Sequence, residues 1–324
     1  MRFDARPLRL PLLPIMRMLT FAFCTFNRAD RLPALVGAMR AQQCPMPFEI
    51  LAVNNNSTDR TADALDALVR QGGAPLRWVN EPVQGIVAAR NRAIAESLDS
   101  DILVFIDDDE MPLPGLLTAV TDAIVNEGAQ CVGGRIDADL SGHVRPRWLD
   151  DELLGFYGAV NHGDKPFWID SEDTPVWSGN VAYDMRLIRQ DPALRFDRRY
   201  DRVGAGIGGG SDHMMLRALL ERHVRIRYRP DMAILHAVDD WKLRRRYFLR
   251  LHYRAGMRHG QYELPDYPRR VSGVPPFLFV QFLKHCAKTL GIVLKRQPGL
   301  VRQAMNASFA LGAVVGYRAR DAQA

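Results

Sequence analysis

The sequence predicts an α/β protein with a mostly parallel sheet flanked by helices, followed by a basic helical extension. Apolar segments rich in β-forming residues alternate four times with segments of helical periodicity, and the connections are short. Three of the apolar segments run directly into polar clusters, as strands do where such a sheet binds a ligand. The chain of 324 residues is 47% hydrophobic and 25% charged, which fills a core and excludes a disordered protein.

The expected elements follow one another closely along the chain. Leu32, Leu35, Val36 and Met39 recur at helical spacing, and the later helices show the same periodicity. The expected strands cover residues 18–26, 48–53, 76–80, 101–106 and 131–136, and the expected helices cover residues 31–42, 61–70, 85–98 and 113–127.

Polar residues mark the ends of three of these strands. Asn27 follows the first strand, residues 54–59 follow the second, and residues 107–110 follow the fourth. Because the carboxyl ends of parallel strands meet at one edge of a sheet, the three clusters point to one crevice. The alternating strand and helix segments contain no GxGxxG, and the sequence contains no GxxxxGK[ST], so neither a dinucleotide-binding site nor a P-loop is supported.

The acidic cluster Asp107-Asp108-Asp109-Glu110 is the most informative stretch. Adjacent carboxylates repel one another and are costly unless they are solvated or neutralised. Mg²⁺ or Mn²⁺, held by one or two carboxylates and by substrate phosphates, is the natural partner at the exit of a buried strand. Because residues two apart point the same way along a strand, we expect Asp107 and Asp109 to share one ligand. The alternative is an exposed acidic turn without a ligand.

Several classes of protein are disfavoured by the sequence. The four cysteines lie far apart without metal-ligand spacing, so neither a structural zinc site nor a disulfide framework is predicted. Residues 1–17 are broken by prolines and lack a small-residue cleavage site, so no secretion signal is predicted. The longest apolar runs, residues 277–283 and 307–317, are shorter than the roughly 20 residues that cross a bilayer. We expect a protein of the reducing cytoplasm.

After residue 137 the alternating pattern stops. Residues 137–176 read as loop, and residues 203–212 form a glycine-rich loop before a helix that starts near His213. Aromatic rings among Gly, Asn and Asp suit a sugar-binding surface and suit a plain core equally well. The rings in question belong to Trp148, Tyr157, Trp168 and Trp177.

Charge is divided unevenly along the chain. Residues 1–216 carry 22 Lys/Arg and 30 Asp/Glu, a net charge of −8, whereas residues 217–324 carry 21 and 7, a net charge of +14. A basic amphipathic helix in this region favours the surface of an anionic membrane, and the alternative is a helix packed on the catalytic domain. Nucleic acid is not a favoured partner, because no known motif accompanies the charge. Lys284, Lys288 and Lys295 are expected on one helical face, opposite Phe279, Phe282, Cys286, Leu290 and Val293.

Ordered short motifs over residues 18–256 resemble those of inverting GT-A glycosyltransferases of family 2. The acidic cluster fills the place of the family's DxD motif, and Gly209-Gly210-Ser211-Asp212 stands where the family often has GGED. The remaining matching elements are Thr25-Phe26-Asn27-Arg28, the stretch from Val53 to Asp59, Gly85 with Ala89-Arg90-Asn91, Gly179-Asn180, His236, and the basic helix from Arg246 to Gly256.

The resemblance implies a donor site for a nucleotide-sugar. Asp107 should touch the ribose or a metal-bound water, Asp109 should bind Mn²⁺ or Mg²⁺ directly, and His236 is a further candidate ligand, with a structural histidine as the alternative. The family frequently has Asp where this chain has Asn54, and an amide can still pair with a base. The other residues implied in nucleotide-sugar binding are Thr25, Asn27, Arg28, Asn55, Arg90, Asn91, Asp108 and Asn180.

The resemblance also implies a general base. Inversion needs a carboxylate near the acceptor hydroxyl, on the face opposite the leaving diphosphate. Ser211 replaces the family's Glu, which leaves Asp212 as the candidate base; its alternative role is to cap the following helix.

We therefore expect a hexosyl-type glycosyltransferase (EC 2.4) that uses a UDP-sugar and a glycan or lipid-linked acceptor in polysaccharide synthesis. It would be peripheral on the cytoplasmic face of a membrane. Three parts are expected: an N-terminal extension (1–17), a GT-A domain (18–236) and a basic helical tail (237–324). Two alternatives are a sugar nucleotidyltransferase, which would need a glycine-rich nucleotide loop near the N-terminus, and a non-catalytic membrane-associated binding protein that has kept the fold.

Overall fold

The computed structural model describes residues 18–203 and 206–320. The first half of the sheet is parallel, with the order β3-β2-β1-β4. The prediction for these strands is confirmed to within one residue at each end, and the predicted absence of a secretion signal lies outside the described residues. The strands are β1 (Leu19–Thr25), β2 (Phe48–Asn54), β3 (Leu76–Asn80) and β4 (Ile102–Asp107).

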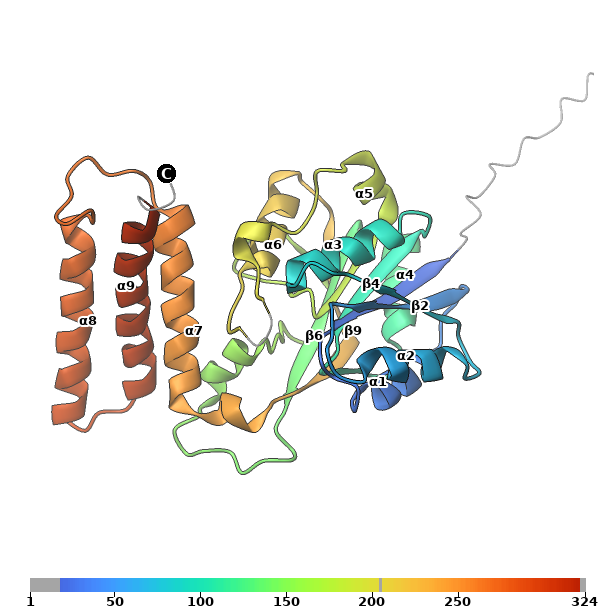
Figure 1. Cartoon of the computed structure of the whole chain (residues 1–324), viewed down its shortest axis with the longest axis horizontal. Coiled ribbons are helices and arrows are strands. Elements are labelled where there is room, and N and C mark those ends of the chain that lie inside the picture. The colour runs from blue at the N-terminus through green and yellow to red at the C-terminus, as the bar shows by residue number, and fades with distance from the viewer. Residues whose placement is uncertain (1–17, 204–205, 321–324) are drawn as a thin grey trace, which may run out of the picture.

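Four helices connect the first strands and cover both faces of the sheet. Figure 1 shows α3 on one side of the sheet and α1 and α2 on the other. The fourth helix begins three residues later than predicted, because the short strand β5 (Glu110–Pro112) and a left-handed Gly115 precede it. The helices are α1 (Leu32–Arg40), α2 (Thr61–Val69), α3 (Ile86–Glu96) and α4 (Leu116–Val125).

The second half of the sheet is mixed, not parallel as the sequence pattern suggested. Strand β8 pairs antiparallel with both β4 and β6, β6 runs parallel to β9, and β5 and β7 pair antiparallel with β9. Local periodicity carries no information on which distant strand becomes a neighbour, so the sequence did not reveal this change. The strands are β6 (Cys131–Asp139), β7 (Phe167–Ile169), β8 (Asn180–Asp184) and β9 (Ile226–Ala237), and α5 (Met185–Gln190) and α6 (Ser211–Glu221) follow β8.

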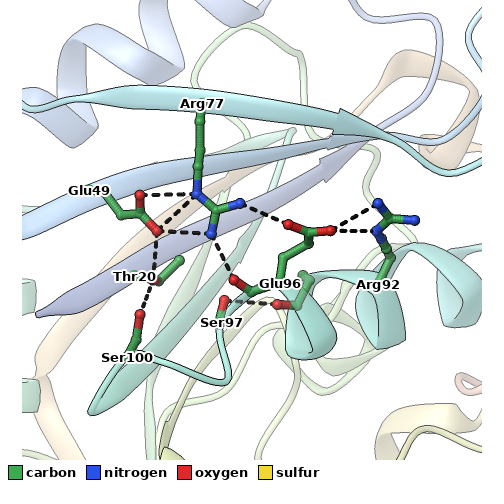
Figure 2. A network of polar contacts seen from close by, with 8 residues as sticks. Thr20, Glu49, Arg77, Arg92, Glu96, Ser97 and Ser100 are labelled. Atoms are coloured by element: carbon green, nitrogen blue, oxygen red, sulfur yellow. Dashed lines mark hydrogen bonds and ion pairs between the residues drawn. The ribbon is translucent and has the colours of Figure 1, made fainter.

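A polar network holds the amino-terminal ends of β1, β2 and β3 together (Figure 2). The Arg77 guanidinium donates to both carboxylate oxygens of Glu49 and to Glu96 at the end of α3, over 3.0–3.1 Å. Thr20 donates to Glu49 and shares a 2.6 Å hydrogen bond with Ser100. These residues lie at the edge opposite the carboxyl ends of the strands, so the network stabilises the sheet and leaves the other edge free for ligands.

The aromatic segment between β6 and β8 belongs mainly to a core. The rings of Trp148 and Tyr157 lie 5.5 and 5.4 Å from the ring of Phe248, and Tyr157 is buried. The plain-core alternative therefore describes both residues. Trp168 is exposed, but the guanidinium groups of Arg225 and Arg227 lie over its ring.

Three long helices form the C-terminal part of the described chain. They are α7 (Arg245–Arg258), α8 (Pro276–Leu294) and α9 (Leu300–Arg320). A π-helical turn, η4 (His259–Glu263), extends α7. Figure 1 shows them side by side at one end of the molecule, with α9 in the middle and α8 outermost. Their apolar contacts form clusters apart from the core of the sheet. The division of the chain near residue 236 remains a prediction.

Glycines allow the closest approach in this helical part. A Cβ on Gly312 of α9 would lie 2.1 Å from the carbonyl oxygen of Tyr253 in α7, and a Cβ on Gly256 would lie 2.0 Å from that of Phe309. Gly260 and Gly316 are equally close to the opposing backbone. The two helices pack backbone against backbone, as helices with small residues four apart do.

We expect Gly312→Ala to destabilise the protein by about 1–3 kcal/mol, because the added methyl group must push α9 away from α7. Gly291→Ala in α8 is the matched control, since no atom lies within 4 Å of its added Cβ. That change should stabilise the protein by about 0.5 kcal/mol through reduced chain entropy. Urea unfolding of both variants measures the difference, and equal effects would contradict the packing described.

Helix α8 is a candidate membrane span by its length and composition, although its uninterrupted apolar run is as short as predicted. This helix has 19 residues, most of them apolar, and very little of it is buried. The apolar run that begins at Phe277 is short because Lys284 and Lys288 interrupt α8. Leu290 and Val293, predicted to face away from the lysines, are also exposed, and the exposed apolar residues of α8 are Phe277, Val280, Leu283, Leu290, Val293 and Leu294.

Candidate active site

A buried arginine joins the end of β4 to the start of α6. The Arg90 guanidinium of α3 donates to Asp107 Oδ1 at 2.9 Å and to Asp212 Oδ1 at 2.7 Å. Its side chain is only 5% exposed, against 27% and 29% for the two carboxylates. Burial opposes its charge, but the carboxylates of Asp212 and Asp107 outweigh it and raise the pKa of Arg90 well above its ordinary value. Asp107 and Asp212, predicted to act on donor and acceptor, therefore lie on either side of one cation.

Asp109 has different partners from Asp107. Its Oδ2 lies 3.5 Å from His236 Nε2 and 3.5 Å from Lys242 Nζ, and the last two atoms are 3.4 Å apart. Burial alone would raise the pKa of Asp109, but the hydrogen bond and charge of His236 and the charge of Lys242 lower it well below its usual range. Strand β4 ends at Asp107, and a turn follows. The expectation that Asp107 and Asp109 point the same way does not apply, because they are not on one continuous strand.

The other two acids of the cluster, Asp108 and Glu110, both have raised pKa values. Burial and the charge of Asp109 raise the pKa of Asp108 to about 7. Burial and the charges of Asp107 and Asp109 also raise the pKa of Glu110 well above its ordinary value, although Glu110 accepts a 2.6 Å hydrogen bond from the backbone N–H of Asp107. Gly179 makes room for this acid, since a Cβ there would lie 2.3 Å from Glu110 Oε1. A bound cation would relieve the repulsion.

Asn27 and Asn54 shape the loops at the carboxyl ends of β1 and β2. Asn27 has a positive φ of 54°, and its side-chain oxygen accepts from the backbone N–H of Thr58 at 2.8 Å. Asn54 Oδ1 accepts from the backbone N–H of Ser57 at 3.1 Å. Arg28 reaches Asp239 at 3.8 Å, and Thr25 ends β1. The structure thus brings Thr25, Asn27, Arg28 and Asn54 to the same edge as Asp107, Asp108 and Asp109.

Three amides predicted to bind the nucleotide-sugar form hydrogen bonds to the backbone in this structure, and their role toward the donor stays a prediction. Asn55 binds Glu81 O, Val83 O and the N–H of Gly85, and fixes the turn before α3. Asn91 makes two hydrogen bonds to the backbone of Phe196. Asn180 donates to the carbonyl groups of Arg135 and Met232 and is fully buried. Their contacts position the loops around the site.

The family model described as Glycosyl transferase family 2 matches residues 20–191, which is more than half of the chain. The chain belongs to glycosyl transferase family 2. This glycosyltransferase is 25% identical over 240 residues to the succinoglycan biosynthesis protein ExoM of Rhizobium meliloti (strain 1021), an alignment that covers 74% of this chain and 72% of the relative.

Solved structures agree on the fold of this glycosyltransferase. The mannosyltransferase PcManGT from Pyrobaculum calidifontis, in complex with GDP-Man and Mn²⁺, matches 94% of this chain and 75% of its own with 18% identity and a TM-score of 0.51. GalNAc-T7 with UDP, GalNAc and Mn²⁺ matches 78% of this chain and 52% of its own with 12% identity and a TM-score of 0.55. The likeness shows the GT-A fold, with the helices α7 to α9 as a C-terminal extension.

The donor atoms of the glycosyltransferase suit a divalent cation shared with a substrate. The carboxylate of Asp109 and the imidazole of His236 are ligands that Mn²⁺ accepts. Phosphate oxygens of a substrate would fill other coordination positions of the ion. The Lys242 ammonium lies 3.5 Å from Asp109 Oδ2 and 3.4 Å from His236 Nε2, so one positive charge already lies beside these two side chains. Asp107 already forms an ion pair with Arg90. Within residues 18–203 and 206–320, no group of three or more His, Cys, Asp or Glu side chains is arranged to hold a metal ion.

Lys242 and the buried contact of Glu110 with the backbone of Asp107 were not predicted from the sequence. Lys242 follows His236 by six residues, but that region was read only as a basic tail. Because β9 ends at Ala237 and η3 (Asp240–Leu243) turns back over the site, this lysine faces Asp109 rather than solvent. The position of Lys242, six residues after the predicted metal ligand His236, was the signal that could have identified it.

Proposed function

We propose that this protein is an inverting glycosyltransferase that moves a hexosyl group from a UDP-sugar to a hydroxyl group of a glycan or lipid-linked acceptor. The observation that supports this most strongly is the bridge from Asp107 through Arg90 to Asp212, because it puts the donor edge of the sheet beside a carboxylate that can act as base. The likeness to ExoM, a succinoglycan biosynthesis protein, supports a role in polysaccharide synthesis.

In the proposed reaction, the acceptor oxygen attacks the anomeric carbon of the donor sugar. The bond from that carbon to the diphosphate oxygen breaks, and the electron pair leaves with the nucleoside diphosphate. Asp212 takes the proton of the acceptor hydroxyl as the new bond forms. Arg90 holds Asp212 in place, and Lys242 and Arg28 are cations at the edge where charge develops on the leaving group. A divalent cation at Asp109 and His236 would supply further stabilisation of that charge.

The donor site is proposed at the loops after β1, β2 and β4. Thr25, Asn27, Arg28 and Asn54 would face the base and ribose, and Asp107 to Asp109 would face the ribose and the diphosphate. Their shared edge of the sheet supports this assignment. A thermal-shift panel of UDP-, GDP- and dTDP-sugars with Mn²⁺ tests it. One nucleotide class should raise the melting temperature, and no shift with any of them would contradict the proposal.

We also propose that α8 holds the enzyme on an anionic membrane surface. Val280, Leu283, Leu290 and Leu294 form an apolar strip that is 48–75% exposed. The exposed residues Lys284, Lys288 and Lys295 run beside this strip on the helix. The opposite face of α8 packs on α9, as the hydrogen bonds between Gln303 and His285 show. An apolar strip next to a basic strip suits a helix lying in the membrane interface.

We expect the double change Lys284→Glu and Lys288→Glu to weaken binding to phosphatidylglycerol vesicles. Each lysine near an anionic surface contributes about 1 kcal/mol, so the loss of two should weaken binding about thirtyfold. Lys165→Glu, an exposed lysine in the loop before β7, is the control. Vesicle co-sedimentation measures the effect, and equal binding of all three proteins would show that α8 does not face the membrane.

A further inference from the structure

A cavity of about 180 Å³ lies next to the proposed active site, between the sheet domain and the C-terminal helices. One wall comes from Tyr200 and from Gly210 and His213 at the start of α6. The other comes from Arg258 at the end of α7 and from His259 and Glu263 in the π-helical turn. The cavity therefore forms only where the catalytic part and the extension meet.

Arg258 is the most unusual residue of this cavity. Within the described residues, its side chain forms no hydrogen bond and no ion pair. Glu263, the nearby acid, is engaged by His259 Nδ1 at 2.9 Å. Burial lowers the pKa of Arg258, and Glu263 only partly opposes this effect. A partly buried guanidinium without a partner is costly unless a ligand supplies the opposite charge.

The glycine-rich loop is built around this guanidinium. A Cβ on Gly208 would lie 3.1 Å from Arg258 Nη2, and one on Gly210 would lie 3.6 Å from Arg258 Nε. Both glycines have positive φ values, +74° and +130°, which other residues rarely adopt. The loop thus passes close to Arg258 without covering it with a side chain.

The first turn of α6 connects the cavity to the candidate base. Asp212 points toward Arg90, with an Nη1–Oδ1 distance of 2.7 Å. Gly210, His213 and Met214, on the same turn, line the cavity. A molecule with one end in the cavity can therefore place another part beside Asp212.

We propose that this cavity binds an anionic group, a phosphate or a carboxylate, carried by the acceptor, with Arg258 as its ion-pair partner. The inference rests on the proposed function, since it names the chemical class of the acceptor. An Arg guanidinium pairs with such oxyanions through two parallel hydrogen bonds, and the amino-terminal end of α6 adds favourable partial charge. A lipid-linked acceptor would supply the anionic group as a phosphate, and an acidic sugar would supply it as a carboxylate. A neutral glycan leaves Arg258 without a partner.

Calorimetric titration of small probes tests the inference. The probes are methyl phosphate and methyl glucuronoside, with neutral methyl glucoside as the control ligand, and the proteins are wild type, Arg258→Gln, Arg258→Lys and Asp109→Asn. At least one anionic probe should bind to wild type and Asp109→Asn alike, and Arg258→Gln should weaken it about tenfold or more. Arg258→Lys should give an intermediate affinity, because it keeps the charge and loses the paired geometry. The probe that binds tells phosphate from carboxylate.

Failure of this inference is distinguishable from failure of the proposed function. No binding of either anionic probe to wild type, or unchanged binding by both Arg258 variants, overturns the anionic acceptor. Binding that is lost in Asp109→Asn and kept in Arg258→Gln also overturns it, because the probe then occupies the donor edge. The proposed function is tested separately by turnover of the nucleotide-sugar, which requires Asp109 and does not depend on the probes.

Discussion

Asp212→Asn is expected to lower turnover of the nucleotide-sugar by about 10²–10⁴-fold, the usual contribution of a general base. The amide cannot accept the proton of the acceptor hydroxyl at neutral pH. It can still accept the hydrogen bond from Arg90, so the start of α6 should keep its place. Release of free nucleoside diphosphate measures turnover, and the dissociation constant of the nucleotide should change little.

The control for this prediction is Asp191→Asn. Asp191 is a half-buried acid that pairs with Arg222 at 2.6 Å, away from the cluster around Arg90. The Asp191→Asn variant should turn over the nucleotide-sugar at the wild-type rate. A turnover rate of Asp212→Asn within about threefold of wild type would assign the residue to capping α6 and leave the reaction without the base proposed here.

Arg90→Leu is expected to destabilise the fold by about 3 kcal/mol, because it leaves the carboxylates of Asp107 and Asp212 close together without their shared cation. The side chain is 5% exposed, so water cannot take its place without rearrangement. Urea unfolding measures the loss. The same variant should also be inactive, since Asp107 and Asp212 would repel each other away from their positions.

Two further variants separate charge from packing at this position. Arg90→Lys restores one positive charge and should recover part of the stability, although it cannot donate to both acids in the same fork geometry. Adding Asp212→Asn to Arg90→Leu should also recover stability, because one of the two repelling charges is gone. If Arg90→Leu unfolds at the same urea concentration as wild type, the bridge from Asp107 through Arg90 to Asp212 contributes nothing to the free energy of unfolding. The proposed structural connection between the donor site and the base would then be contradicted.

Much of the site was predictable from the order of strand ends. Apolar strands that run into polar residues placed Asn27, Asn54 and Asp107 at one edge, and the register of β1 with β2 and β4 agrees. Asp212 was found through a motif, and its contact with Arg90 needed the fold, because the two residues are 122 positions apart.

The parts that the sequence did not predict depend on contacts between distant segments. The strand exit was expected to continue through Asp109, but a turn separates Asp109 from Asp107 and sends it to His236. Lys242 and Arg258 look like ordinary basic residues of a charged tail until η3 and α7 fold against the sheet domain. The mixed half of the sheet was hidden for the same reason, since strand partners are not encoded in local periodicity.

The most direct test of the central claim, that the Asp109 and His236 edge holds a metal-bound nucleoside diphosphate, is a calorimetric titration of UDP, GDP and dTDP with Mn²⁺ and with EDTA. At least one of them should bind wild type in Mn²⁺, and binding should weaken about tenfold or more in EDTA and in Asp109→Asn. Equal affinity in all three conditions, or no binding by any of the nucleotides, would contradict the account.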